Sequence, residues 1–77
     1  MKENPFDVVL KRPLGQFTTA LYEVFQVGVS VGYLENIGPG TPRPWRAFEK
    51  LGPQSWVRVG LYFASQHEAF EALKAAL

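Results

Sequence analysis

The sequence predicts an α+β domain in which a small antiparallel sheet of about three strands carries a C-terminal helix on one face. Two segments, residues 25–33 and 56–63, alternate apolar side chains with small or polar ones, a period typical of strands with one buried face. Residues 65–77 instead begin with a capping signal and then place apolar side chains at helical spacing. At 77 residues the chain has the length of one domain, so we predict a single domain over residues 1–77.

Residues 6–11 favour a short strand, because apolar side chains alternate along them. The apolar side chains of one face are Phe6, Val8 and Leu10. A type I turn is predicted at residues 12–15, because Pro13 occupies its second position and Gly15 its fourth.

Residues 16–24 accept either strand or helix, since β-favouring threonine and tyrosine alternate with helix-favouring alanine, leucine and glutamate. If they are strand, they join residues 25–33 in a run of 18 residues, which is too long without a bulge or bend. We favour this long bent strand. Over residues 25–33 its predicted buried face carries Phe25, Val27, Val29, Val31 and Tyr33, and its other face carries Gln26, Gly28, Ser30 and Gly32.

Residues 36–44 predict a loop, since three prolines and two glycines prevent regular structure. Residues 45–51 are then predicted to form a short helix. Pro44 suits the first turn of such a helix, Gly52 suits the position just beyond its end, and Pro53 prevents its continuation.

The last two elements complete a predicted order of strand, strand, short helix, strand, helix (β-β-α-β-α). One face of the strand at residues 56–63 carries Val57, Val59, Leu61 and Phe63, and the other carries Trp56, Arg58, Gly60 and Tyr62. Ser65 and Glu68 form a capping box for a helix that begins at Gln66 and ends near Ala76. Its apolar face carries Ala69, Phe70, Leu73, Ala76 and Leu77, and we expect this face to lie on the valine side of the sheet.

Composition and charge narrow the class of protein. The net charge is +1, which implies no strongly charged target, although residues 41–60 carry four basic residues and one acidic one. The absence of cysteine excludes disulfides and thiolate zinc sites. Because 47% of the residues are hydrophobic in so short a chain, part of this apolar surface is expected to lie against a partner. No signal peptide or membrane span is recognisable, so we predict a cytoplasmic protein.

No catalytic, metal-binding or cofactor-binding motif is recognisable. His67 is the only histidine, and with Glu71 it would supply two metal ligands but no third. No serine has a base and an orienting group in a recognisable arrangement. Gly38-Pro39-Gly40 lacks the lysine and hydroxyl residue of a phosphate loop. The sequence therefore predicts a protein that is not an enzyme and needs no cofactor.

The candidate binding residues are the large and cationic side chains of the last predicted strand and of the short helix, together with the nearly bare polar face of the strand at residues 25–33. They are Trp45, Arg46, Trp56, Arg58 and Tyr62, with Gly28 and Gly32 as the bare surface. The rings could cover the glycines within one chain, form a homodimer or protein-partner surface, or stack nucleic-acid bases. We predict a non-enzymatic module acting through protein contacts, self-associating with the rings of one copy over the glycines of the other. A small nucleic-acid-binding protein using the same face is the alternative.

Overall fold

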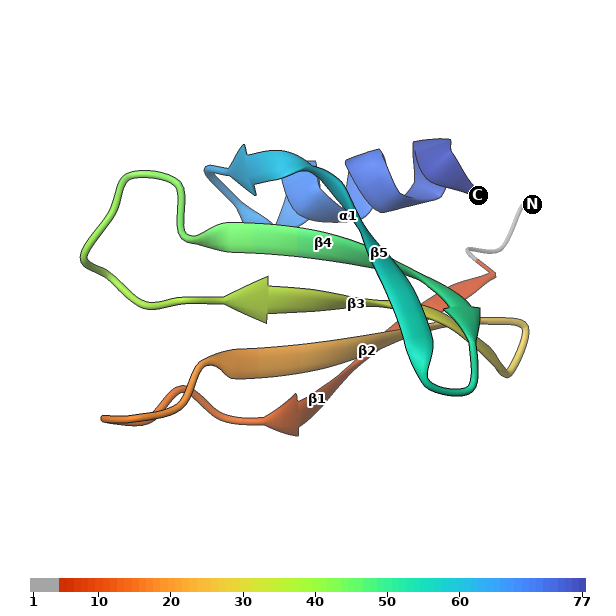
Figure 1. Cartoon of the computed structure of the whole chain (residues 1–77), viewed down its shortest axis with the longest axis horizontal. Coiled ribbons are helices and arrows are strands. Elements are labelled where there is room, and N and C mark those ends of the chain that lie inside the picture. The colour runs from red at the N-terminus through yellow and green to blue at the C-terminus, as the bar shows by residue number, and fades with distance from the viewer. Residues whose placement is uncertain (1–4) are drawn as a thin grey trace.

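The chain forms five antiparallel strands followed by one helix (Figure 1). The computed structural model describes residues 5–77. Its elements are β1 (Phe6–Arg12), β2 (Ala20–Gln26), β3 (Val29–Asn36), β4 (Trp45–Gly52), β5 (Ser55–Phe63) and α1 (Gln66–Ala76). Each strand pairs with its neighbour in sequence, so the sheet order is β1-β2-β3-β4-β5. The structure is α+β with a C-terminal helix, but the predicted β-β-α-β-α order with about three strands is wrong.

The short helix predicted at residues 45–51 is instead the strand β4. Ala47 lies opposite Leu34 of β3 on one side and Val59 of β5 on the other. A helix of two turns is marginal by itself, whereas a strand between two others satisfies its backbone groups on both sides. Pro53, which resembled a helix stop, lies in the turn between β4 and β5.

The long strand predicted over residues 16–33 is also wrong, because a two-residue turn divides it into β2 and β3. Gln26 pairs with Val29 across this turn, and the φ angles of Val27 and Gly28 are 50° and 80°. Positive φ at both central residues is typical of the type I′ turn, whose twist matches that of a hairpin. Glycine adopts this conformation without cost, but a β-branched valine does not.

The turn changes which side chains of residues 25–33 are buried. Val29, predicted near the centre of the buried face, is 64% exposed. The β2–β3 register shifts after Val24, which leaves Val31 as the extra residue of a bulge. Phe25 and Tyr33 lie on the side of the sheet that α1 does not cover.

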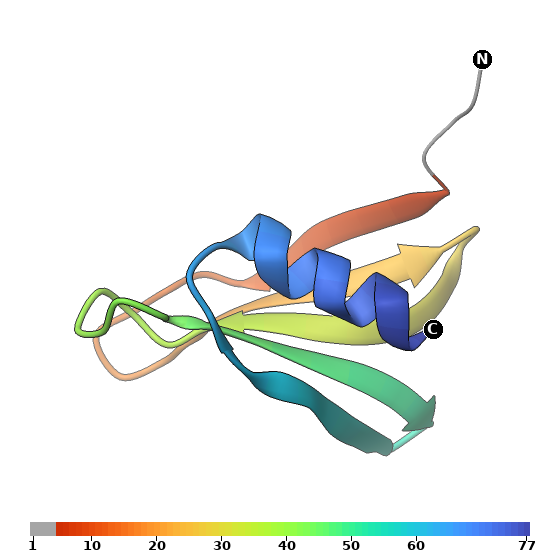
Figure 2. The same cartoon turned by 90° about the horizontal axis from the view of Figure 1, so that it is seen from above.

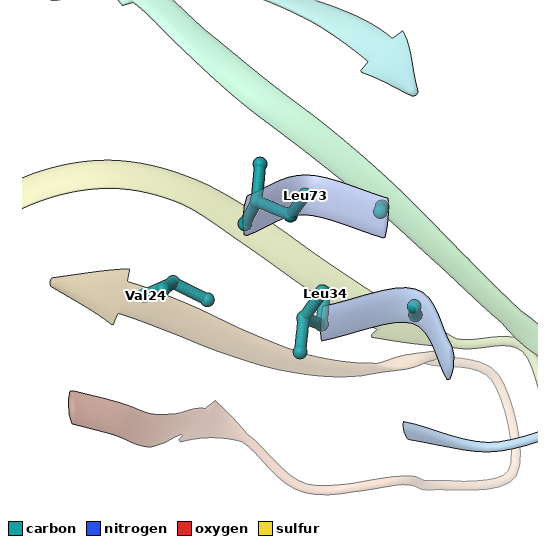
Figure 3. Close-up of a cluster of buried hydrophobic side chains, with 5 residues drawn as sticks. Val24, Leu34 and Leu73 are labelled. Atoms are coloured by element: carbon teal, nitrogen blue, oxygen red, sulfur yellow. The ribbon is translucent and has the colours of Figure 1, made fainter. Parts of the chain in front are cut away.

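The core lies between the sheet and α1, which covers one face as predicted (Figure 2). Its buried residues are Val24, Leu34, Ala47, Ala69 and Leu73, and three of them are labelled in Figure 3. At Gly32 the helix approaches the sheet closely: a Cβ atom there would lie 3.0 Å from a methyl group of Leu73 and would collide with the Phe48 carbonyl oxygen. At the other margin, the rings of Phe6 and Phe70 meet edge to face, with centroids 5.5 Å apart.

The predicted start of α1 is confirmed. The Glu68 backbone N–H donates to the Ser65 hydroxyl at 3.1 Å, and a Glu68 carboxylate oxygen accepts from the Ala64 N–H at 3.2 Å. The Ser65 hydroxyl thus satisfies a backbone donor that the first turn of a helix leaves free, while the Glu68 carboxylate holds the residue that precedes the N-cap.

We expect Val27→Asn to stabilise the protein by about 1 kcal/mol, because it replaces a strained β-branched residue by the one preferred before glycine in a type I′ turn. Val27 is 78% exposed, so little buried surface is lost. Urea titration measures the change, with Val29→Asn as the matched control outside the turn. A lower unfolding midpoint for Val27→Asn than for the parent would show that Val27 is not strained.

We expect Leu34→Ala to lower the free energy of unfolding by about 2–5 kcal/mol, because Leu34 is fully buried between β3 and α1. Val29→Ala, the matched truncation at an exposed position of the same strand, should change it by no more than about 0.5 kcal/mol. Denaturant unfolding followed by circular dichroism distinguishes the two variants. Equal losses would contradict the assignment of the buried face.

Candidate ligand-binding face

The side of the sheet turned away from α1, which we call the open face, is uncovered by any other element of residues 5–77 (Figure 2). Residues that are direct cross-strand partners point to the same side of a sheet. By the register of the strands, the open face carries Asp7, Val9, Lys11, Arg12, Leu21, Glu23, Phe25, Ser30, Tyr33, Glu35, Arg46, Phe48, Lys50, Trp56, Arg58 and Tyr62. Five of these side chains are aromatic, and five are basic.

A hollow of about 310 Å³ lies in the open face. All five strands contribute to it, through Arg12, Leu21, Tyr33, Glu35, Phe48 and Trp56. The sheet twists so strongly that β5 crosses over its neighbours in the view of Figure 1. The twist brings the ring of Trp56 to Tyr33, two strands away, with centroids 5.6 Å apart. The open face is therefore concave, with Trp56 forming one wall of the hollow and Arg12 another.

Two of the three acidic side chains of the open face, Glu23 and Glu35, are already balanced by cations. Glu35 accepts hydrogen bonds from Arg46 and Thr19 at 2.5 Å each, and an Arg12 nitrogen lies 3.9 Å away. Glu23 accepts from the Ser30 hydroxyl at 2.6 Å and lies 3.7 Å from the Lys11 ammonium group. With five basic and three acidic residues, the open face carries a charge of +2.

Two cations of the open face have no carboxylate partner within residues 5–77. Lys50 lies opposite Trp56 across the β4–β5 ladder. The guanidinium group of Arg58 lies 4.4 Å from the centre of the Tyr62 ring and donates two hydrogen bonds to the Leu61 carbonyl oxygen. A planar guanidinium held flat on a ring presents its outer face and remaining donors to a ligand.

The same contact affects the ionisation of Tyr62. The hydrogen bond and then the charge of Arg58 lower the pKa of the Tyr62 phenol below its ordinary value. Desolvation opposes this lowering, and the charge of Arg46 adds to it.

The structure brings together four of the seven predicted binding residues. Arg46, Trp56, Arg58 and Tyr62 lie on the open face. Trp45 lies on the opposite side of the sheet, where its ring packs 5.6 Å from that of Tyr22.

The two predicted glycines lie away from the rings. Gly28 is in the β2–β3 turn and Gly32 is buried beneath Leu73, so neither glycine forms a bare surface beside the rings of the open face. The physical reason is that the turn at residues 27–28 ends β2, and that Gly32, opposite the core residue Val24, faces α1.

Sequence reasoning missed Arg12, Tyr33, Glu35 and Phe48 as parts of the site. Phe48 was not placed on a face of the sheet, because residues 45–51 were predicted to form a helix. Alternation of Trp45 and Ala47 with Arg46 and Phe48 was the available signal for a strand with Phe48 on the open face.

Other site types are not seen in residues 5–77. No group of three or more His, Cys, Asp or Glu side chains gathers there as metal ligands, and His67 is exposed at the start of α1. The one helix of this part of the chain is too short to cross a membrane. No protein-family model, curated protein or solved structure matches the chain.

We expect Arg58→Met to raise the pKa of Tyr62 toward the ordinary tyrosine value of about 10, because it removes the hydrogen bond and the charge that favour the phenolate. The ultraviolet absorbance of tyrosinate during an alkaline titration measures the change. Tyr62→Phe is the control, since it removes the phenol whose pKa Arg58 lowers. An unchanged titration curve for Arg58→Met would contradict the Arg58–Tyr62 contact.

Proposed function

We propose that this chain is a non-enzymatic, cytoplasmic module that binds single-stranded nucleic acid on its open face. The observation that supports the proposal is the combination, on one concave surface, of five aromatic rings with cations that no carboxylate neutralises. Single-stranded nucleic acid is bound through these two kinds of side chain, since bases stack on rings while basic groups meet the phosphates.

The hollow suits one flat heterocycle. Its volume of about 310 Å³ is at the lower end of small-ligand sites, which span about 300–1,000 Å³. Tyr33, Phe48 and Trp56 supply ring surface at the hollow. A base inserted there would stack on Trp56, which is 51% exposed before any ligand binds.

The unpaired cations are placed to meet the backbone of the same strand. Lys50 is the cross-strand neighbour of Trp56, and Arg58 lies two residues further along β5 on the same side. A base stacked against Trp56 therefore has cations next to it on two strands. Glu23 and Glu35 do not oppose this binding strongly, because Lys11, Arg12 and Arg46 balance their charges locally.

A protein partner on the open face is the competing proposal. Tryptophan, tyrosine and arginine are also the residues that contribute most to protein–protein binding. Two physical differences separate the proposals. Phosphate contacts release counterions and weaken with salt, whereas a protein interface centred on Trp56 and Tyr62 responds weakly to salt. Charge favours nucleic acid, since the open face carries +2 while the whole chain carries +1.

We expect fluorescently labelled, mixed-sequence single-stranded DNA and RNA oligonucleotides to bind with an affinity that falls about fivefold to tenfold between about 50 and 200 mM NaCl, as two neutralised phosphates imply. Trp56→Ala should weaken binding by about fivefold or more through loss of stacking. Fluorescence anisotropy measures both effects.

Matched lysine variants distinguish binding at the open face from attraction to the overall charge of the protein. Lys50→Ala and Lys74→Ala each remove one positive charge, but Lys74 lies on α1, where it pairs with Glu71 at 3.0 Å. Only Lys50→Ala should weaken binding and reduce the salt dependence. No binding of either oligonucleotide at the lower salt concentration, or equal effects of the two lysine variants, would refute the nucleic-acid proposal and favour a protein partner.

A further inference from the structure

The strand β1 is an edge strand with apolar side chains exposed on both faces. It pairs only with β2, and its outer edge has no strand beside it in residues 5–77. Val8, Val9 and Leu10 are 36%, 42% and 51% exposed. Exposed edges of this kind are templates for pairing with another chain, and soluble proteins usually shield them.

The sequence of β1 is self-complementary when two copies of the strand lie antiparallel with their Val9 residues opposite each other. An antiparallel copy centred there places Asp7 opposite Lys11 of the second copy, Val8 opposite Leu10 and Phe6 opposite Arg12. Asp7 and Lys11 both lie on the open face, while Val8 and Leu10 lie on the side of α1, so each of these two pairs meets on one side of the sheet. Phe6 and Arg12 lie on opposite sides and do not contribute to the match. Asp7 has no ion pair within residues 5–77.

We propose that two copies of this chain pair through β1, antiparallel and about a two-fold axis at Val9, to form one continuous ten-stranded sheet. This inference is independent of the proposed function, because it uses the outer edge of β1 and not the hollow. A two-fold axis perpendicular to the sheet keeps both helices on one side. Both open faces then lie side by side on the other.

The charges specify this register over its alternatives. A parallel pairing in register would place Lys11 opposite Lys11 of the second copy. An antiparallel pairing centred on Leu10 would instead place Lys11 opposite Val9. An edge lysine and a bulge usually discourage pairing, and β1 has both at Lys11. Here the lysine meets an unpaired aspartate of the second copy, so that it favours one partner and one register.

Charge swapping tests the register directly. We expect the parent chain to change from monomer to dimer mass with concentration in sedimentation equilibrium. Asp7→Lys alone and Lys11→Asp alone should each raise the dimer dissociation constant by about tenfold, because the two-fold axis turns one substitution into two like-charge contacts. An equimolar mixture of the two variants should recover the dimer. In the mixed dimer, each contact between position 7 of one copy and position 11 of the other joins a lysine to an aspartate.

Cross-linking gives a second measurement that does not depend on affinity. The chain has no cysteine, so Val9→Cys places one thiol on the two-fold axis. Opposite residues of antiparallel strands have Cα atoms about 4.5–5.5 Å apart, which a disulfide can span. Mild oxidation should convert Val9→Cys largely to a covalent dimer and leave the exposed control Val29→Cys mostly monomeric. A parent chain that stays monomeric at all concentrations, or equal cross-linking of the two variants, would overturn the proposal.

Discussion

The close contact between Leu73 and Gly32 determines how the rest of the structure is arranged. Because Gly32 has no side chain, Leu73 of α1 approaches β3 closely at this point, and the 11 residues of the helix cover the buried cluster of Val24, Leu34 and Ala47. One helix can cover only one side of a five-stranded sheet. The opposite side must therefore be stabilised by contacts among its own side chains, and these contacts create the candidate site.

The sequence predicted the elements whose signals are local. The capping residues Ser65 and Glu68 specified the start of α1, because this hydrogen bonding involves neighbours along the chain. The strand β4 was not predictable in the same way, since residues 45–51 have acceptable helix ends and become a strand only through pairing with β3 and β5. The turn at Val27 was missed because valine is a poor residue for positive φ, so the usual asparagine signal was absent.

The part of the candidate site that depends on local signals was also predictable from the sequence. Alternation along β5 placed Trp56 and Arg58 on one side correctly, because period two is a property of a single strand. The partners of these residues depend on strand order, which alternation does not encode. Once β4 is inserted, Phe48 and Tyr33 replace the predicted glycines as the neighbours of Trp56. Glycines in a predicted strand therefore indicate the close approach of another element but not which one. At Gly32 the neighbours are the Phe48 carbonyl oxygen of β4 and Leu73 of α1.

The ion pairs of the open face separate its structural cations from those available to a ligand. Glu35 is 16% exposed and is held by Arg46 and Thr19, which fixes these side chains around one edge of the hollow. A carboxylate so placed would repel a phosphate if it were unpaired, but a paired one adds little net charge and much rigidity. Rigid walls reduce the entropy lost when a flat ligand is bound. The charge that remains for recognition belongs to Lys50 and Arg58, both at the aromatic side of the hollow, so stacking and phosphate contact would act together rather than at separate places.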